Sequence, residues 1–203
     1  MTVNEAAVMF KNFELRRMQL NEVTIRVRIG GDGPPLILLH GHPQTHVMWH
    51  KIAPRLADDF TVVVPDLRGY GESYKPPTDK NHYPYSKRVM AQDQVELMNR
   101  FGFHHFSVAG HDRGGRCAYR LALDFPEVVT KLAVLDIVPT GEAFQRTAMD
   151  FALGYFHWFF LAQPYDFPEK MIGENPANFY FRNDRSMFHP EALEDYMRCS
   201  NGS

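Results

Sequence analysis

An aspartate stands between glycines where a strand is expected to turn into a helix. The segment follows the apolar run 106–109 and reads Gly110-His111-Asp112-Arg113-Gly114. Small flanking residues permit a turn too tight for larger side chains. The pattern is typical of a nucleophile elbow, which presents its central side chain at the carboxyl end of a strand. The alternative is an aspartate that only caps the following helix.

The chemistry of this elbow depends on its central residue, Asp112. A carboxylate is ionised at neutral pH and can attack a saturated carbon, expelling a leaving group. The product is an ester of the enzyme, which water can hydrolyse at its carbonyl carbon, whereas an alkylated serine would be a dead-end ether. Asp112 therefore favours opening of a carbon–halogen bond or an epoxide over ester hydrolysis.

Two arginines follow the aspartate closely. Arg113 and Arg116 lie in the first turn of the expected helix, where the helix dipole disfavours cations. Their i, i+3 spacing lets them converge on one substrate carboxylate and bind it through several N–H donors. The alternative is an ion pair within the protein for Arg116, with Arg113 extended to solvent.

The elements that must position these side chains follow from the hydrophobic pattern. Residues 13–20 and 23–29 are predicted to form a hairpin, and apolar runs at 36–39, 62–64, 106–109 and 132–135 predict buried strands. Helical spacing is found over 49–57, 86–100 and 113–124. Alternating buried strands and helices with short links predict a parallel sheet wrapped on both faces.

The composition changes after about residue 140. Eleven aromatic residues lie between Phe151 and Phe181, and no further apolar strand run is evident there. We therefore expect two domains. The first is a core over residues 1–140, through the strand that ends at Asp136, and the second is a partial helical cap over 141–203.

Composition excludes several function classes. The 203 residues hold 22 Lys and Arg against 24 Asp and Glu, a formal net charge of −2, whereas nucleic-acid binding needs a concentrated excess of positive charge. The sequence has no run of 18 or more apolar residues, which is the pattern that predicts a membrane-spanning helix. Two cysteines cannot form a disulfide framework, and the first residues lack a secretory pattern, so a cytoplasmic location is expected.

Three further segments match motifs of the α/β-hydrolases in order and spacing. They are the oxyanion-loop pattern His40-Gly41-His42-Pro43, the D-x-R-G-x-G-x-S segment 66–73, and the acid in Leu135-Asp136-Ile137-Val138-Pro139. The predicted fold class is therefore α/β, an α/β-hydrolase fold with a mostly parallel sheet, helices on both faces and a helical cap. The fold is expected to be incomplete at its C-terminal side.

Within that fold the sequence resembles the fluoroacetate (haloacetate) dehalogenases. The resemblance is carried by Gly110–Arg116, His40–Gln44, Leu135–Thr140 and, in the aromatic stretch, Tyr155–Phe160. Haloalkane dehalogenases and epoxide hydrolases of this fold usually carry Trp after the nucleophile, where this chain has Arg113. The resemblance implies a small-molecule 2-haloacid substrate such as fluoroacetate, converted to the hydroxyacid (glycolate) and halide, and a homodimer.

The resemblance also implies residue roles. Asp112 attacks the halogen-bearing carbon while Arg113 and Arg116 hold the substrate carboxylate. His157 and Trp158 donate hydrogen bonds to the departing halide, although packing within an aromatic helix is the alternative for this pair. Backbone N–H groups of Arg113 and of His42, where the family usually has Phe, stabilise the oxyanion, and Asp136 orients the base, with a turn cap as its alternative role.

The base itself is missing from the expected set. The family places its catalytic histidine, and a halide-binding cap tyrosine, beyond the residues present here, and none of the ten histidines is a good substitute. His46 and His50 have i, i+4 spacing that could serve a metal, but no third ligand accompanies them. We expect neither metal nor cofactor, and a chain that on its own stalls after one alkylation of Asp112.

Two other functions stay open. An epoxide hydrolase of the same fold would use cap tyrosines to activate the epoxide oxygen and would not need the paired arginines. The other is a binding module, in which the chain is a non-catalytic, truncated α/β-hydrolase fragment.

Overall fold

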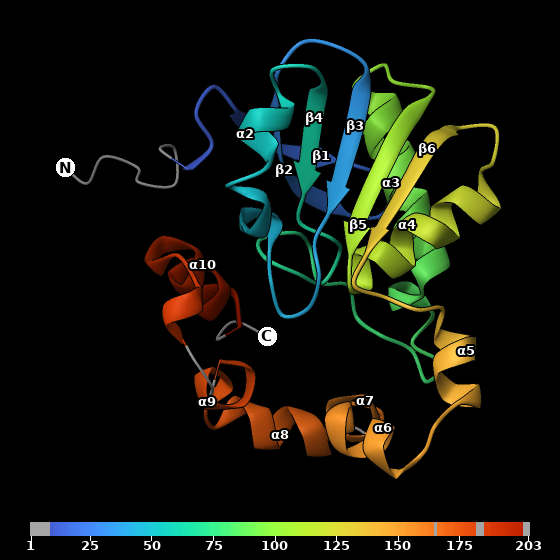
Figure 1. Ribbon diagram of the computed structural model, residues 1–203, viewed down its shortest axis with the longest axis vertical. Coiled ribbons are helices and arrows are strands. Elements are labelled where there is room, and N and C mark those ends of the chain that lie inside the picture. Colours follow the sequence, from blue (N-terminus) through green and yellow to red (C-terminus); the bar gives the residue numbers. More distant parts are fainter. Residues whose placement is uncertain (1–8, 165, 182–184, 201–203) are drawn as a thin grey trace.

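The computed structural model describes residues 9–164, 166–181 and 185–200. These residues form a six-stranded sheet with the order β1-β2-β4-β3-β5-β6 (Figure 1). The strands are β1 Glu14–Gln19, β2 Thr24–Gly30, β3 Pro35–Leu39, β4 Thr61–Pro65, β5 Phe106–His111 and β6 Val129–Leu135.

The sheet is mostly parallel, as predicted. Strands β3 to β6 are mutually parallel, whereas β1 and β2 form the expected antiparallel hairpin and β2 runs antiparallel to β4. The parallel strands are joined by the helical elements that follow each of them. These are η1 His46–Trp49 with α2 Ala53–Leu56, then α3 Lys87–Arg100, then α4 Arg113–Asp124.

The single helix predicted over 49–57 is wrong. The chain instead forms the short 3₁₀ helix η1 and then begins α2, with Pro54 in its first turn. Proline has no N–H to donate to a preceding turn and is tolerated at the start of a helix, where that donor would be unsatisfied anyway. The proline therefore separates the two pieces that the apolar spacing alone joined.

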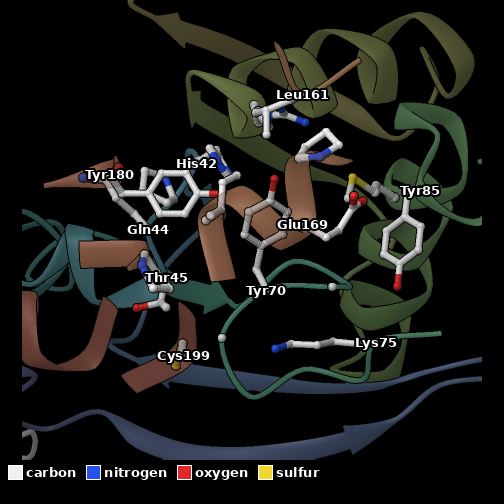
Figure 2. Close-up of a pocket in the computed structure, with 18 of the residues that line it drawn as sticks. His42, Gln44, Thr45, Tyr70, Lys75, Tyr85, Leu161, Glu169, Tyr180 and Cys199 are labelled. Atoms are coloured by element: carbon white, nitrogen blue, oxygen red, sulfur yellow. The ribbon is translucent and has the colours of Figure 1, made fainter. Parts of the chain in front are cut away.

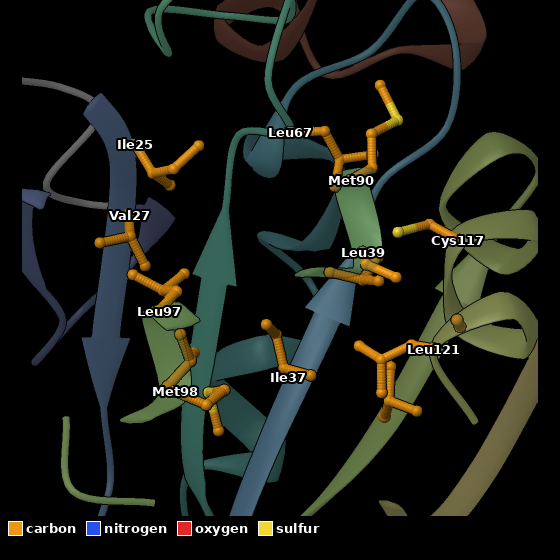
Figure 3. Packing of buried hydrophobic residues seen from close by; sticks show 14 of the residues in the cluster. Ile25, Val27, Ile37, Leu39, Leu67, Met90, Leu97, Met98, Cys117 and Leu121 are labelled. Carbon is orange, nitrogen blue, oxygen red and sulfur yellow. The ribbon is translucent and has the colours of Figure 1, made fainter. Parts of the chain in front are cut away.

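Strand β3 is buried on both faces, and its alternate side chains enter two different cores. Ile37 and Leu39 pack with residues of α3 and α4, among them Leu97 and Leu121 (Figure 3). On the opposite face Leu36 and Leu38 join a cluster whose other members include Trp49, Ala53, Phe181 and Tyr196. Full burial of one such aliphatic side chain contributes about 1.5–3 kcal/mol to the stability of the fold. The position of β3, and with it the start of the loop that follows, is therefore well fixed.

Beyond β6 the described residues form helices. They are α5 Thr140–Gln145, α6 Met149–Gly154, α7 Phe156–Phe160, α8 Phe167–Gly173, α9 Pro176–Tyr180, η3 Arg185–Met187 and α10 Pro190–Ser200. Aromatic rings pack on one another in α6 and α7, with Phe151 near Tyr155 and Trp158. Tyr165, one of the eleven aromatics in this stretch, lies outside the described residues. Among those described, no helix has both the length and the apolarity needed to cross a membrane.

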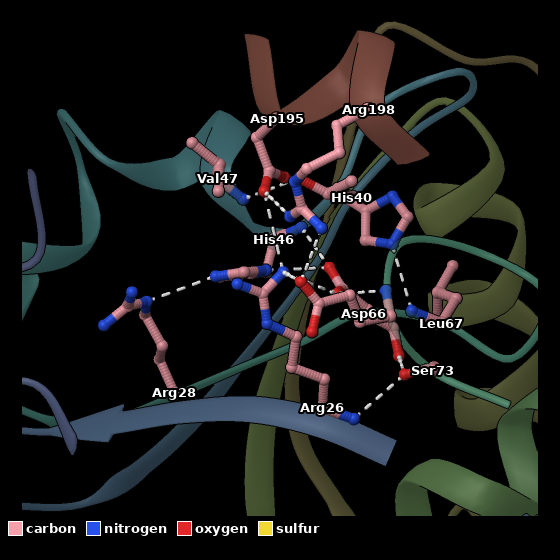
Figure 4. Close-up of polar contacts among 12 residues, drawn as sticks. Arg26, Arg28, His40, His46, Val47, Asp66, Leu67, Ser73, Asp195 and Arg198 are labelled. Atoms are coloured by element: carbon pink, nitrogen blue, oxygen red, sulfur yellow. Dashed lines mark hydrogen bonds and ion pairs between the residues drawn. The ribbon is translucent and has the colours of Figure 1, made fainter. Parts of the chain in front are cut away.

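A buried charge cluster joins α10 to the sheet (Figure 4). Asp66, at the end of β4, is fully buried and accepts hydrogen bonds of 2.8 Å from the backbone N–H and from the ring Nδ1 of His46. Arg26 Nη1 lies 3.6 Å from Asp66 Oδ2 and 3.6 Å from Asp195 Oδ1 of α10. Thr45 Oγ1 donates a 2.6 Å hydrogen bond to Asp195 Oδ2. The cluster therefore links residues far apart in sequence.

The cluster stabilises the charged form of Asp66. Burial acts to raise the pKa of this carboxyl, but His46, together with His40 and Arg26, outweighs burial and holds the pKa well below its usual range. Since the folded-state pKa is lowered, the resulting stabilisation is present above the unfolded-state pKa and is lost as pH falls toward the folded-state value.

Replacing this carboxylate should destabilise the protein. We expect Asp66→Asn to reduce the free energy of unfolding by about 3–5 kcal/mol at neutral pH, because Arg26 and His46 lose a buried partner. The exposed Asp58→Asn should change it by less than about 0.5 kcal/mol. Urea denaturation at neutral pH and near pH 3 is the measurement, and the difference between the variants should shrink in acid. Equal stability of the two variants at neutral pH would contradict this role.

Candidate active site

Asp112 occupies the turn between β5 and α4, as the elbow motif predicts. Its backbone has φ 48° and ψ −117°, a conformation that side-chain-bearing residues rarely adopt. Two backbone hydrogen bonds hold it there. Asp112 N donates to Leu135 O at 3.2 Å, and Arg116 N donates to Asp112 O at 3.0 Å. The Asp112 carboxylate makes no capping hydrogen bond to the helix that follows.

Close backbone packing explains the second glycine of the motif. A Cβ at Gly114 would lie 2.2 Å from the carbonyl oxygen of Leu39 and 2.5 Å from that of His40. The first turn of α4 therefore rests directly on the end of β3, which no larger residue would allow. This packing brings the loop after β3 to the side of Asp112.

The loop after β3 points a donor at the Asp112 carboxylate. The backbone N–H of His42 donates a 2.9 Å hydrogen bond to Asp112 Oδ2. Gly41 leaves the necessary room, since a Cβ there would lie 2.9 Å from Asp112 Cβ and 3.1 Å from Oδ2. The donor lies where negative charge would develop when water adds to an ester of Asp112.

A cavity of about 620 Å³ opens beside this loop. It is lined by residues of the loops after β3 and β4 and, from the helical region, by residues of α8 and α9 (Figure 2). The imidazole of His42 lies against two tyrosines, with ring centroids 5.8 Å from Tyr70 and 4.9 Å from Tyr180. Burial, followed by the charge of Arg113, lowers the pKa of His42 to about 3, so this ring is neutral.

The two predicted arginines have different surroundings. Arg113 lines the cavity. Arg116 is buried, and its Nη1 donates to Val138 O at 3.0 Å and to Thr140 Oγ1 at 2.7 Å. Its guanidinium also lies 4.5 Å from the ring centroid of Trp158. Arg113 therefore faces the cavity, where the Tyr70 hydroxyl lies within hydrogen-bonding reach of it, while Arg116 is held by the segment that leads to α5 and by α7.

His157 and Trp158 lie on α7 and are half-buried. Burial lowers the pKa of His157, the Arg113 charge lowers it further and Asp112 partly opposes the shift, so its ring is within electrostatic reach of both. Trp158 packs its ring against Phe144, Phe151 and Tyr155 at centroid separations of 5.6–5.7 Å. The ring of Trp158 thus has a packing role in addition to any contact with a ligand.

Asp136 follows β6 in a left-handed conformation with φ 54°. Its side chain is 90% exposed, and Oδ2 lies 3.7 Å from His111 Nε2. The ladder between β5 and β6 places it beside the elbow, but its carboxylate faces outward in this structure.

Sequence reasoning missed three residues that line the cavity, Tyr70, Lys87 and Tyr180. Lys87 carried a usable signal, since it lies in the first turn of α3, where the dipole disfavours cations just as it does at Arg113. Tyr180 carried none, because aromatic residues are abundant between Phe151 and Phe181, and Tyr70 occupies an unspecified position of the motif over 66–73. His46, considered above as a metal ligand, has both ring nitrogens engaged, one with Asp66 and one with Arg28. Among the described residues no group of three or more metal-ligating side chains converges.

Known proteins are similar to this chain along most of its length. The chain is 48% identical over 197 residues to a fluoroacetate dehalogenase from Burkholderia sp, covering 94% of this chain and 65% of that protein. It is 35% identical over 184 residues to a soluble epoxide hydrolase from Corynebacterium sp. (strain C12), covering 84% and 61%. A crystal structure of a candidate alpha/beta hydrolase from Nostoc sp PCC 7120 is 54% identical, superposes with a TM-score of 0.92 and covers 95% and 68%.

The chain thus spans less than two thirds of the length of the two curated relatives. The model of the alpha/beta hydrolase fold family matches residues 34–190, which is more than half of the chain and includes the loop after β3, the elbow and the strand that leads to Asp136. The sheet order, the strained turn at Asp112 and this match together show that the chain belongs to the alpha/beta hydrolase fold family.

Proposed function

We propose that this chain carries the nucleophile and substrate cavity of a hydrolytic dehalogenase for short 2-haloacids such as fluoroacetate. The observation that carries the proposal is the pairing of Asp112, oriented by the His42 N–H at 2.9 Å, with the cavity-lining Arg113. An oriented carboxylate supplies the nucleophile, and the neighbouring cation supplies a place for the carboxylate of the substrate. The similarity to a fluoroacetate dehalogenase supports the same reaction.

The first step is a displacement at the halogen-bearing carbon. An oxygen of Asp112 forms a bond to that carbon as the carbon–halogen bond breaks, and the halide leaves with the bonding electrons. Fluoride is a poor leaving group unless N–H donors stabilise it, and His157 and Trp158 are proposed to supply them. Arg113 holds the substrate carboxylate, while Arg116 adds its charge from behind and keeps the Trp158 ring in place.

The second step releases the product. Water adds to the carbonyl carbon of the Asp112 ester, and the N–H groups of His42 and Arg113 stabilise the oxyanion. The bond between that carbon and the ester oxygen then breaks, which frees the hydroxyacid and restores the Asp112 carboxylate. The proton of that water must go to a base, for which the resemblance to the dehalogenases points to a histidine outside this chain. Asp136 is proposed to orient that base.

The proposal extends to organisation and location. Residues 1–140 act as the core and residues 141–203 as the cap, since residues of α8 and α9 supply one wall of the cavity. The partner is a small-molecule haloacid. We further propose that the protein is a homodimer and is located in the cytoplasm.

An epoxide hydrolase is a second candidate, and one observation favours it. Tyr180 of α9 lines the cavity, and burial raises the pKa of its hydroxyl to about 12, so it stays protonated and could donate a proton to an epoxide oxygen. The similarity to a soluble epoxide hydrolase agrees with this reading. Arg113 argues against it, because an epoxide has no charge for that cation to bind.

Alkylation of Asp112 tests the proposed function directly. Incubated with chloroacetate or fluoroacetate, the protein should gain one carboxymethyl group on Asp112, because the displacement needs only residues that this chain contains. Asp112→Asn should gain none, and the exposed Asp58→Asn should react as the wild type does. Intact-mass spectrometry with peptide mapping is the measurement. Reaction with an aryl epoxide but with no haloacid would favour the second candidate, and modification elsewhere would reject both.

Halide stabilisation makes a separate prediction about His157. Replacing it with Phe should slow alkylation by fluoroacetate by about 10²–10³-fold, the usual loss for one donor to a developing anion. Bromide leaves readily without such help, so alkylation by bromoacetate should slow by less than about tenfold. The exposed His105→Phe is the matched control and should leave both rates unchanged. Equal slowing with both substrates would show that His157 does not act on the halide.

A further inference from the structure

Lys87 brings a second cation to the same cavity from a different helix. It is the first residue of α3, directly after the capping residue Ser86, and it lines the cavity together with Arg113. Helices α3 and α4 pack side by side on one face of the sheet (Figure 1). The first turns of two neighbouring helices therefore each contribute one cation to the space beside Asp112.

The ammonium of Lys87 has a poor hydrogen-bond partner. Its Nζ lies 3.2 Å from Met90 Sδ, and a thioether is only a weak acceptor. Across the part of the chain that the structure describes, no carboxylate lies within 4.0 Å of the charged nitrogens of Lys87 or Arg113. Arg116, by contrast, has two oxygen acceptors and an aromatic ring.

The charges around Lys87 leave this region of the cavity short of an anion. The groups that act on it electrostatically are Asp112, Arg113, Arg116 and Cys117. Asp112 is the one carboxylate among them, and its Oδ2 is bound by the His42 N–H. Elsewhere the cavity wall includes Lys75 and Glu169. Cations removed from water without a counterion are costly, and a bound anion offsets that cost.

We propose that Lys87 is a substrate-binding residue that holds the carboxylate of the haloacid opposite Arg113. This inference rests on the proposed function and deepens it. The carboxylate is bound by Arg113 and Lys87 within the cavity, and Arg116 supports it from outside the lining. Selection for haloacids over neutral haloalkanes then comes from two helices, so neither cation alone accounts for it.

The test measures binding of acetate, which has the carboxylate but no leaving group, to the full chain by NMR titration. Lys87→Met should weaken acetate binding by about tenfold or more, the usual loss for a hydrogen bond between charged groups. Arg88→Met is the matched control. It removes the same charge from the next residue of α3, whose exposed side chain faces Asp124 at 3.4 Å, and it should leave binding unchanged.

The pH dependence separates binding by Lys87 from a structural role. Burial, followed by the charge of Arg113, lowers the pKa of Lys87 to about 8. Burial raises the pKa of the nearby Cys117 thiol to about 12. Acetate affinity of the wild type should therefore fall between about pH 7 and about pH 9.5, as Lys87 loses its proton. Lys87→Arg should keep its affinity across that range, and Lys87→Met should be weak and independent of pH.

Each outcome decides a separate point. Acetate binding by Lys87→Met that equals the wild type, or a wild type that binds acetate no better than acetamide, would overturn the role of Lys87. If acetate binding depends on Lys87 but no haloacid alkylates Asp112, the anion site stands and the dehalogenase reaction fails. If Lys87→Met is misfolded by circular dichroism, the folded Lys87→Arg decides through its pH profile, because a wild-type decline in that variant would reject the proposal.

Discussion

The contact between the end of β3 and the first turn of α4 determines the geometry of the whole site. Only a hydrogen fits between Gly114 and the carbonyl oxygens of Leu39 and His40. Because the two backbones touch, the loop that leaves β3 must pass beside Asp112, and its His42 N–H reaches the carboxylate at 2.9 Å. A side chain at Gly114 would push the two backbones apart and so disturb the hydrogen bond between the His42 N–H and Asp112.

Charged side chains near this contact lack ion-pair partners among the described residues. Among the described residues Asp112 has no cation within ion-pair distance, and Arg113 and Lys87 likewise lack carboxylate partners. Cations near helix N-termini also oppose the helix dipoles. A protein that tolerates such a local violation usually does so for function, since stability alone would favour neutral or acidic residues there.

Elsewhere charges of the same kinds lie in ion pairs. Asp66 contacts His46 and Arg26, and Arg26 also lies near Asp195 of α10. Arg68 pairs with Asp93 at 2.6 Å. This cluster ties the last described helix to the sheet and to the loop after β3, next to the cavity wall that α8 and α9 provide. The carboxylates of this cluster thus have cationic partners, whereas Arg113 and Lys87 in the cavity lack carboxylate partners among the described residues.

Local patterns in the sequence determined most of the elements and the turn at Asp112. Alternating runs of apolar residues predicted the hairpin and the parallel strands, helical spacing predicted α4 over the observed residues, and G-x-D-x-G predicted the turn at Asp112. These succeed because each depends on residues within a few positions of one another. Even so, the apolar periodicity predicted one helix where η1 and α2 are separate, because periodicity takes no account of the backbone N–H that Pro54 lacks.

Contacts between distant segments were decided only by the tertiary structure. The spacing of Arg113 and Arg116 predicted convergence, but the chain after β6 supplies oxygens that hold Arg116, and α3 brings Lys87 to the cavity instead. Likewise nothing in the local pattern pairs Asp66 with Asp195. Which charges are neutralised and which stay open to a ligand depends on how separate elements pack, and no local pattern records that.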